Sequence, residues 1–266
     1  MTGIPVLAAG DARTFEMLEW RSAEVLAEHV MYAHDDRAAL CVAPLVPGGA
    51  DAWLRWAWVQ DGAPLRLLQE ILDAQAARLR MLHVRALWCV DMRGSWLLHA
   101  LRERGFRRVD EVVTYEAPTA AASAGSIADV EIVDVAESDL SVLSEVDARA
   151  FAAPWRYPEA VLRAAQAQVQ VFAAARVVDR LVGYVLAVVH GENAHVVRLA
   201  VDPSYGRRGL GTALLVGAMQ RVHAMGARRV TLNTLKSLPA GHLYRRLGFR
   251  PLPRVGIDVL WREVPT

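Results

Sequence analysis

At residues 201–215 the chain reads VDPSYGRRGLGTALL, which follows the β-branched run HVVRLAV (195–201) and leads into a sequence of helical character. Backbone amides that open a helix are free donors with partial positive charge, and small residues let a phosphate approach them closely. Neighbouring arginines add charge that can neutralise the phosphate. The junction therefore predicts a phosphate-binding turn. Its glycines and arginines are Gly206, Arg207, Arg208, Gly209 and Gly211.

The glycine spacing separates this turn from two familiar phosphate loops. The run is G-x-x-G-x-G rather than the G-x-G-x-x-G of dinucleotide-binding folds, and it lacks the Gly-Lys-Ser/Thr of a P-loop. Taken alone, the pattern also fits a plain strand-to-helix turn with solvated arginines. The surrounding sequence has to decide between these two interpretations.

Composition indicates a globular protein without an overall charge bias. Of the 266 residues, 54% are hydrophobic and 22% are charged, which permits a substantial core in one large domain or in two smaller ones. The 30 basic and 29 acidic residues give a formal net charge of +1. No general field therefore favours nucleic acid or an anionic membrane, and any basic site must be local.

The two cysteines, Cys41 and Cys89, are too few for a disulfide framework or a cysteine metal cluster. The first residues carry no basic segment ahead of their apolar patch, and no apolar run reaches the roughly 18 residues of a membrane span. We therefore expect a cytoplasmic protein with no metal site and no membrane or nucleic-acid partner.

A stretch of small residues, APTAAASAGS at 117–126, lacks hydrophobic periodicity and is a candidate linker. On each side of it the sequence predicts the same order of strand, helix, strand, helix, strand, which indicates two α/β units. The expected division is an N-terminal domain at 1–117, a linker at 118–127 and a C-terminal domain at 128–266.

Hydrophobic periodicity places the elements of the two halves. In the first half we expect a strand at 53–60, a helix at 65–79 and a strand at 85–90. In the second half the corresponding elements are 195–201, 212–226 and 228–235. Each half then ends in a short helix, a Gly-Phe pair and an alternating strand, within 94–116 and 239–263. The glycine suits the left-handed position that ends a helix.

From about residue 127 to the last residue, the sequence resembles the GNAT family of acyl-CoA N-acyltransferases. The match consists of GRRGLG (206–211), of DPSY ahead of it and of LYRRLGF (243–249) about 35 residues later. The family has Gln or Arg where this chain has Gly206, and Arg207 or Arg208 could supply the missing cation. The combination of both motifs at this separation is specific.

The resemblance implies a mixed, mostly antiparallel twisted sheet flanked by helices and splayed between two central strands, with acetyl-CoA in the gap. The strand ahead of the turn would offer its backbone to the pantetheine, and amides of the turn would hold the pyrophosphate. The pantetheine residues are Leu199, Ala200 and Val201. The pyrophosphate residues are Arg207, Arg208, Gly209, Leu210, Gly211 and Thr212.

The resemblance also implies catalytic groups. Tyr244 matches the family tyrosine that protonates the CoA sulfur, and its alternative is a core aromatic. The ribosomal-protein alanine N-acetyltransferases, which the C-terminal half resembles, place a glutamate base where this chain has Asn233, and an amide cannot take a proton at neutral pH. His195 stands about where histone-type members place a glutamate, with a structural histidine as the alternative. His190 and Glu192 are weaker candidates.

Strand alternation places His195, Val197, Leu199 and Val201 on one face, which would let a neutral imidazole at 195 reach the reacting amine. Trp155 and Tyr157 lie where the family shapes its acceptor pocket, and ordinary packing is their alternative. Ser237 stands where many relatives have Asn, seven residues before the tyrosine.

The first half is expected to be a degenerate copy, an arrangement similar to tandem members such as mycothiol synthase. Its turn at 59–64 contains one glycine, the acidic Asp61 and Pro64, which lacks an amide donor. Leu98 or His99 takes the place of the catalytic tyrosine. We therefore expect no acyl-CoA to bind in the first half.

The expected activity is transfer of an acetyl group from acetyl-CoA to a primary amine, by direct attack in a ternary complex. A small-molecule amine is the leading acceptor. A protein N-terminus is the alternative acceptor, and a non-catalytic acyl-CoA-binding regulatory module is the alternative class of protein.

Overall fold

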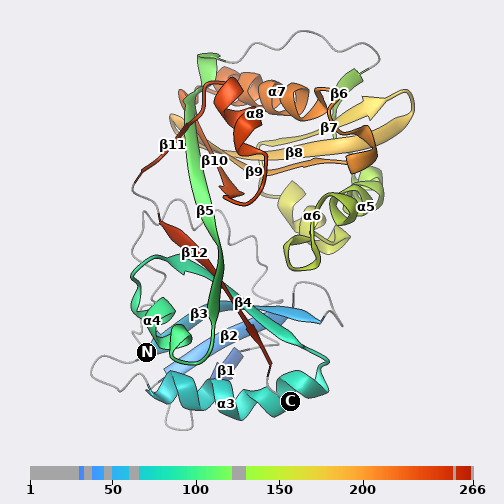
Figure 1. Ribbon diagram of the computed structural model, residues 1–266. Coiled ribbons are helices and arrows are strands. Elements are labelled where there is room, and N and C mark those ends of the chain that lie inside the picture. The colour runs from blue at the N-terminus through green and yellow to red at the C-terminus, as the bar shows by residue number, and fades with distance from the viewer. Residues whose placement is uncertain are drawn as a thin grey trace. The chain divides into compact units, whose positions relative to one another are not determined.

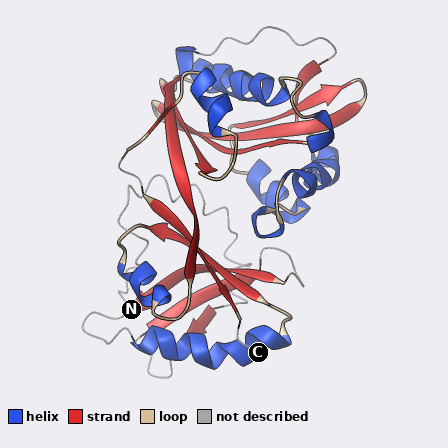
Figure 2. Ribbon diagram, in the orientation of Figure 1, coloured by secondary structure: helices blue, strands red, loops and turns tan. Residues whose placement is uncertain are grey.

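A computed structural model describes residues 30–32, 38–44, 50–59, 66–121, 130–253 and 256–264. Backbone contacts divide the chain into two compact units (Figure 1). The first unit comprises Met1–Val112 and Val255–Thr266, and the second comprises Val113–Arg254. Each is a sheet flanked by helices (Figure 2).

The first unit contains a sheet in the strand order β1-β2-β3-β4-β12-β5. Only β3 and β4 pair in parallel among these described strands, and the other neighbours are antiparallel. Its strands are β1 (Val30–Tyr32), β2 (Ala38–Pro44), β3 (Asp51–Val59), β4 (Ala86–Met92), β12 (Ile257–Glu263) and the first part of β5 (Arg107–Pro118). Its helices are α3 (Arg66–Met81) and α4 (Trp96–Arg102).

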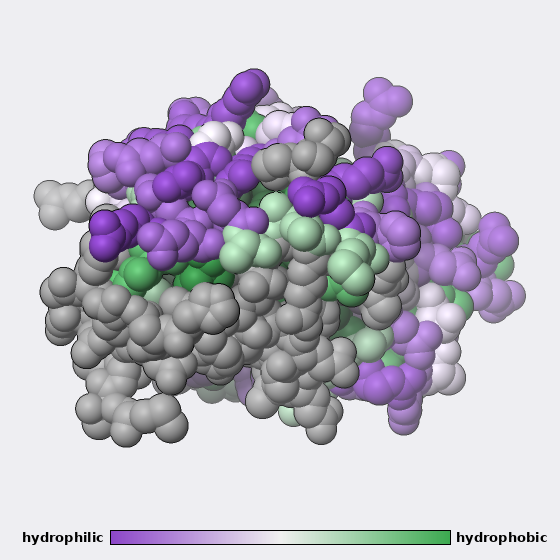
Figure 3. Space-filling view, turned by 90° about the horizontal axis from the view of Figure 1, so that it is seen from below, coloured by the Kyte–Doolittle hydropathy of each residue, from purple (hydrophilic) through white to green (hydrophobic). Residues whose placement is uncertain are grey.

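Two amphipathic helices close the core of the first unit. Leu68, Ile71 and Leu72 of α3 and Leu98 and Leu101 of α4 are at most 4% exposed and belong to one cluster of buried residues. The opposite side of α3 is polar, as the apolar spacing of a surface helix requires. In Figure 3, seen from below the view of Figure 1, many of the described residues at the surface are hydrophilic.

The second unit contains a sheet in the order β5-β10-β9-β8-β7-β6, with β11 (Arg250–Pro251) on the other edge of β5. Its remaining strands are β6 (Val130–Asp134), β7 (Val171–Val177), β8 (Arg180–His190), β9 (Asn193–Val201) and β10 (Arg229–Leu235). Its α-helices are α5 (Leu140–Ala150), α6 (Glu159–Gln166), α7 (Leu210–Ala224) and α8 (Gly241–Arg246). Single 3₁₀ turns are η2 (Thr119–Ala121), η3 (Glu137–Asp139), η4 (Ala153–Trp155) and η5 (Pro203–Tyr205).

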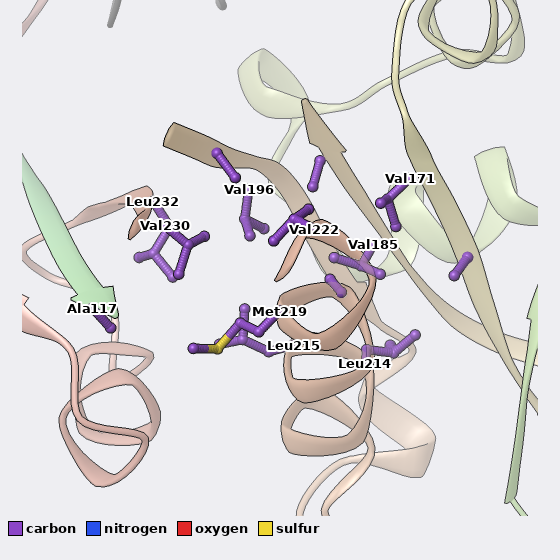
Figure 4. Packing of buried hydrophobic residues seen from close by; sticks show 14 of the residues in the cluster. Ala117, Val171, Val185, Val196, Leu214, Leu215, Met219, Val222, Val230 and Leu232 are labelled. Carbon is purple, nitrogen blue, oxygen red and sulfur yellow. The ribbon is translucent and has the colours of Figure 1, made fainter. Parts of the chain in front are cut away.

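Helices cover both faces of this second sheet. In Figure 1, α7 and α8 lie on one face and α5 and α6 on the other. The core of the unit lies under α7, where Leu214, Leu215 and Met219 pack toward valines of β8, β9 and β10 (Figure 4). These three α7 side chains are fully buried. The helix that follows the glycine turn is thereby fixed on the sheet by apolar burial.

Both units contain a pair of parallel strands that separate along their length. In the second unit, β9 and β10 pair from Asn193↔Arg229 to Val196↔Leu232, and both strands then continue unpaired with each other. In the first unit, β3 and β4 pair only from Asp51↔Ala86 to Trp53↔Trp88. The shared order of strand, helix, strand, helix, strand is confirmed in both halves. The predicted splay between two central strands is present in the second half.

The compact units differ from the sequence-based division at 1–117, 118–127 and 128–266. Strand β12, expected to close the C-terminal domain, pairs with β4 and β5 in the first unit. The second part of β5, expected to close the N-terminal domain, belongs to the second unit, where its Thr114 hydroxyl donates to Asn233 of β10. The first linker residues are ordered, since the Thr119 hydroxyl donates to the Ala227 carbonyl at 2.7 Å.

Two further findings apply to the described residues alone. Every helix among them is too short or too polar to cross a membrane. They contain no group of three or more His, Cys, Asp or Glu side chains that could hold a metal ion.

Candidate active site

The turn between β9 and α7 is fixed at its start by Asp202. Its Oδ1 accepts hydrogen bonds from the Ser204 amide at 2.9 Å and from the Ser204 hydroxyl at 2.6 Å. Its Oδ2 accepts a charge-assisted bond from Arg149 Nε of α5 at 2.7 Å. Although burial raises the pKa of Asp202, these hydrogen bonds from Ser204 and Arg149 hold it below its ordinary value. The chain therefore leaves β9 in one defined direction.

Backbone conformation then turns the chain into α7. Arg207 has φ +62° and Gly209, the N-cap of α7, has φ +82° and ψ −2°. Left-handed residues in a turn can direct successive amides into one concavity that suits an anion. The first amides of α7, from Leu210 to Thr212, have no acceptor within the helix. These amides include those expected to hold a pyrophosphate, and that role stays a prediction.

Gly211, in the first turn of α7, lies close to α8 and to the end of β9. A Cβ atom at this position would lie 3.4 Å from Leu243 Cδ2 and 3.9 Å from Val201 Cγ2. A single methyl group would therefore fit, whereas a longer side chain would press on Leu243 of α8 and Val201 of β9. The glycine leaves the first helical amides accessible to a ligand.

Strand β9 presents a free backbone edge beside the turn. Its pairing with β10 ends at Val196, whereas its pairing with β8 continues to Val201. The backbone groups between Val197 and Val201 that point away from β8 therefore have no ladder partner on β10. This edge includes Leu199, Ala200 and Val201, the residues predicted to hold pantetheine amides.

A β-bulge in β9 changes which side chains share a face. Leu186 of β8 pairs with Arg198 while the next residue, Ala187, pairs with Val196, so Val197 is the extra residue. Ala194 and Val196 before the bulge and Leu199 and Val201 after it all pack with the cluster under α7. The expectation that His195, Val197, Leu199 and Val201 share one face is therefore wrong. Strict alternation fails because the inserted residue reverses it.

His195 lies in the paired part of β9, opposite Thr231 of β10. Its Nδ1 is 2.8 Å from the Thr231 hydroxyl oxygen, which itself donates to the Ala194 carbonyl. The hydroxyl therefore accepts from Nδ1–H, and Nε2 carries the lone pair. Desolvation by burial lowers the pKa of His195 to about 4. An imidazole with that pKa is a weak general base at neutral pH.

Tyr244 occupies the buried side of α8. Its ring centroid is 5.7 Å from that of Tyr115 of β5 and 6.0 Å from that of Phe249. The residue is 7% exposed, and none of the described residues forms a hydrogen bond with its phenol. Burial, together with the neighbouring Tyr115, raises the pKa of Tyr244 to about 12. A buried hydroxyl without a protein partner is available to a ligand.

Asn233, at the position of the family glutamate, is held in a hydrogen bond rather than poised as a base. Its side-chain oxygen accepts from the Thr114 hydroxyl at 2.8 Å. The weaker candidates His190 and Glu192 are exposed at the far end of the β8–β9 hairpin. Glu192 there forms an ion pair with Arg228 at 3.0 Å. Ser237 is exposed in the segment between β10 and α8.

The predicted acceptor residues lie between α5 and α6, against β9. Trp155 and Tyr157 are both partly exposed. The Arg198 guanidinium of β9 lies 4.0 Å from the centre of the Tyr157 ring and donates to the Trp155 carbonyl at 2.6 Å. Strand β9 therefore carries both Arg198 and residues 199–201, and the glycine turn follows it directly. Sequence reasoning missed Arg198, although a charge within the apolar run HVVRLAV is a signal of a buried partner.

Comparison with known proteins gives this arrangement a family. Residues 140–249 match the model of the acetyltransferase (GNAT) family. These residues form a GNAT acetyltransferase domain. The match includes the glycine turn, the bulged strand β9 and Tyr244.

A curated relative of this GNAT domain is the mycothiol acetyltransferase of Clavibacter michiganensis subsp. michiganensis (strain NCPPB 382). The two sequences are 36% identical over 113 residues, which are 42% of this chain and 33% of that protein. The matched part therefore spans about a third of the relative.

Solved GNAT structures share the fold over most of the chain. A GCN5-related N-acetyltransferase from Sphaerobacter thermophilus has a TM-score of 0.65 at 16% identity, and the match covers 97% of this chain and 87% of that one. A tandem GNAT protein from the clavulanic acid biosynthesis pathway has a TM-score of 0.59 at 16% identity, with 86% and 79% covered. At these identities the likeness concerns the fold alone.

That the first unit is a degenerate copy stays a prediction. Asp61 and Pro64 of its turn lie outside the described residues. Of the two residues in the place of Tyr244, Leu98 is 1% exposed in the core, and His99 is exposed beside Glu103. Neither provides a buried hydroxyl comparable with that of Tyr244.

Proposed function

We propose that the GNAT domain transfers an acetyl group from acetyl-CoA to the primary amine of a small molecule, by direct attack in a ternary complex. The observation that carries this proposal is the combination of a left-handed turn at the start of α7 with the buried Tyr244, whose phenol has no hydrogen-bond partner among the described residues of the same unit. The name of the curated relative, a mycothiol acetyltransferase, supports a small acceptor.

The residues present fit acetyl-CoA. The turn at Gly209 and Gly211 would present helix-terminal amides to a diphosphate, and Arg207 and Arg208 would add positive charge. The free edge of β9 offers backbone donors and acceptors to the pantetheine amides. When bound, acetyl-CoA supplies the thioester that makes the acetyl group transferable.

The protein's own part in the chemistry is to position groups and to move protons. The backbone of β9 and the amides of α7 would orient the acetyl donor, which accounts for a large share of catalysis in a two-substrate reaction. Tyr244 would give its phenolic proton to the departing sulfur. Its raised pKa keeps that proton on the oxygen until it is needed.

We expect the protein to contribute less to removal of the amine proton. His195 stays the proposed acceptor of that proton, with Nε2 as the basic atom. Because its pKa is about 4, its contribution to the rate should be small. We therefore expect the substitution His195→Gln to lower turnover far less than Tyr244→Phe.

Two measurements test the proposal. Calorimetry should detect binding of acetyl-CoA, and thiol release should then appear with at least one primary amine among glucosamine, cysteine, spermidine and a peptide that begins with alanine. Release with the peptide alone would favour the protein N-terminus as acceptor. Binding without thiol release from any amine would favour a non-catalytic module. Absence of acetyl-CoA binding would overturn the proposal.

A further inference from the structure

Arg198 is the centre of a buried cluster that the proposed chemistry does not use. Its Nε and Nη2 donate to the two carboxylate oxygens of Asp147 in α5, at 2.8 and 2.7 Å. Tyr184 of β8 donates its hydroxyl to Asp147 Oδ2 at 2.5 Å. Asp147 and Tyr184 are fully buried, and Arg198 is 8% exposed. The cluster therefore satisfies its own polar atoms almost entirely away from water.

The same guanidinium is stacked between two aromatic rings. Its central carbon lies 3.4 Å from the centroid of Phe151 and 4.0 Å from that of Tyr157. Arginine suits this role because its planar head can stack on rings while its edge donates in a fixed fork. The rings belong to the first and last residues of the segment 151–157, which is called the acceptor loop below.

Hydrogen bonds fix the backbone of the acceptor loop to the same two charged groups. Arg198 Nη2 donates to the Trp155 carbonyl at 2.6 Å, and the Tyr157 amide donates to Asp147 Oδ1 at 2.7 Å. The loop is thus held at its middle by the guanidinium and at its end by the carboxylate. Loss of the planar fork would release both rings and one carbonyl at once.

A buried ion pair of this kind is weak evidence for a purely stabilising role. Replacement of a buried ion pair by apolar side chains of similar volume is often neutral or stabilising, because burial of two charges costs about as much as their attraction returns. A geometrical role is the better-supported use of such a pair. Arg198 also lies in the part of β9 that has no β10 partner, beside the backbone edge assigned to pantetheine.

We propose that Arg198 is a positioning residue that holds the acceptor loop in the geometry required to bind the amine substrate. The inference rests on the proposed function. It deepens that function by naming the Arg198 guanidinium as the group that fixes the conformation of the acceptor site. In this role Arg198 would act through Trp155 and Tyr157 and would contact neither the acetyl donor nor the reacting atoms. Its loss should therefore affect the acceptor and leave the donor site intact.

The main test is the substitution Arg198→Lys, which keeps the charge and loses the fork and the stacking plane. The probe is whichever of the four amines the wild type acetylates. We expect the acceptor KM to rise about tenfold or more, with kcat and the dissociation constant of acetyl-CoA changed by less than about twofold. A second substitution, Phe151→Leu, removes one ring and spares the ion pair, and it should also raise the acceptor KM. Phe151→Tyr keeps a ring, so its acceptor KM should stay at the wild-type value.

Asp258→Asn is the matched control, because Asp258 is another buried carboxylate with arginine partners, and it lies in the first unit. It should lower the melting temperature while the acceptor KM stays within about twofold of wild type. An acceptor KM that also stays unchanged in folded Arg198→Lys would overturn the inference. So would a parallel rise in the dissociation constant of acetyl-CoA, which would make the effect structural.

Hydrogen exchange provides a readout that needs no acceptor. The amide of Tyr157 is bonded to Asp147, so Arg198→Lys should speed exchange within residues 151–157 and leave α7 unchanged. Unchanged exchange in the loop would contradict the positioning role. If wild-type protein binds no acetyl-CoA, the proposed function fails first. If it binds and acetylates normally and only the variant results disagree, this inference alone fails.

Discussion

His195 Nδ1 lies 2.8 Å from Thr231 Oγ1, across the next-to-last paired position of the two parallel strands β9 and β10. The imidazole is 3% exposed, and desolvation lowers its pKa to about 4. In an unfolded chain the same group titrates near 6.5. The native protein therefore holds a neutral histidine at pH values where the unfolded chain would protonate it.

This difference predicts a loss of stability in mild acid. As pH falls from about 6.5 to about 4, the unfolded chain binds a proton that the native state does not, so the free energy of unfolding drops by about 3 kcal/mol. Above this window the histidine contributes no pH dependence. Urea unfolding at several pH values gives the free energy of unfolding at each pH. Over this window that free energy should change less steeply with pH for His195→Gln than for wild type. Identical slopes would mean that His195 titrates normally in the native state.

Local patterns in the sequence were sufficient to predict the order of the elements. The glycines that end α4 and α8, Gly105 and Gly248, have φ of +80° and +85°, as their position before Phe106 and Phe249 suggested. The turn after β9 was also predictable, because its glycines and its place between strand and helix are local features. Such signals depend on backbone preferences within a few residues.

The remaining features depend on partners distant in the sequence. The bulge at Val197 arises from the register of β8 against β9, and it reverses the face expected for Leu199. The pairing of β12 with β4 depends on which strand edge of a sheet is available, and the hydrophobic periodicity of the β12 sequence does not indicate that partner. The pairing of Arg198 with Asp147 joins residues 51 positions apart. Tertiary context decides these points.

The glycine turn gives a prediction on acetyl-CoA affinity. Gly211→Leu should weaken binding about tenfold or more, because the longer side chain would press on Leu243 and Val201 and displace the first turn of α7. Gly217→Ala is the control in the same helix, since a Cβ there meets Ile132 at an ordinary 3.7 Å. It should leave the affinity unchanged and slightly raise stability. Calorimetry measures both, and equal affinities for the two variants would place the diphosphate elsewhere.

The buried carboxylate of Asp258 gives a prediction on stability. Arg93 and Arg108 donate to its Oδ1 and Arg102 donates to its Oδ2, at 2.8 to 3.1 Å. Although burial raises the pKa of Asp258, the bonds and charges of Arg93 and Arg108 hold it below its ordinary value. Asp258→Asn should cost about 1–3 kcal/mol at neutral pH, a modest figure because the arginines are half-exposed.

The sign of the acid dependence follows from the lowered pKa of Asp258. Its stabilising contribution is complete above the unfolded value near 3.8 and is lost as pH falls through the lower native value. Wild type and Asp258→Asn should therefore converge in stability in strong acid. Glu111→Gln, which alters a less buried partner of Arg93 and Arg108, should cost about 1 kcal/mol or less. If the free energies of unfolding of wild type and Asp258→Asn still differ in strong acid, the difference arises from packing rather than from charge.

Tyr244 gives the prediction that separates an enzyme from a binding module. Tyr244→Phe should lower thiol release about 10²- to 10⁴-fold, because the departing sulfur loses its proton donor. The dissociation constant of acetyl-CoA should change by less than about twofold, since the ring and its packing remain. Because burial raises the pKa of Tyr244 to about 12, the wild-type rate should not fall through ionisation of this group in moderately alkaline buffers.

Tyr115→Phe is the matched control, since the Tyr115 hydroxyl accepts from Arg245 at 3.3 Å and the ring packs on Tyr244. If both variants release thiol at similar rates, Tyr244 is a core aromatic and another group protonates the sulfur.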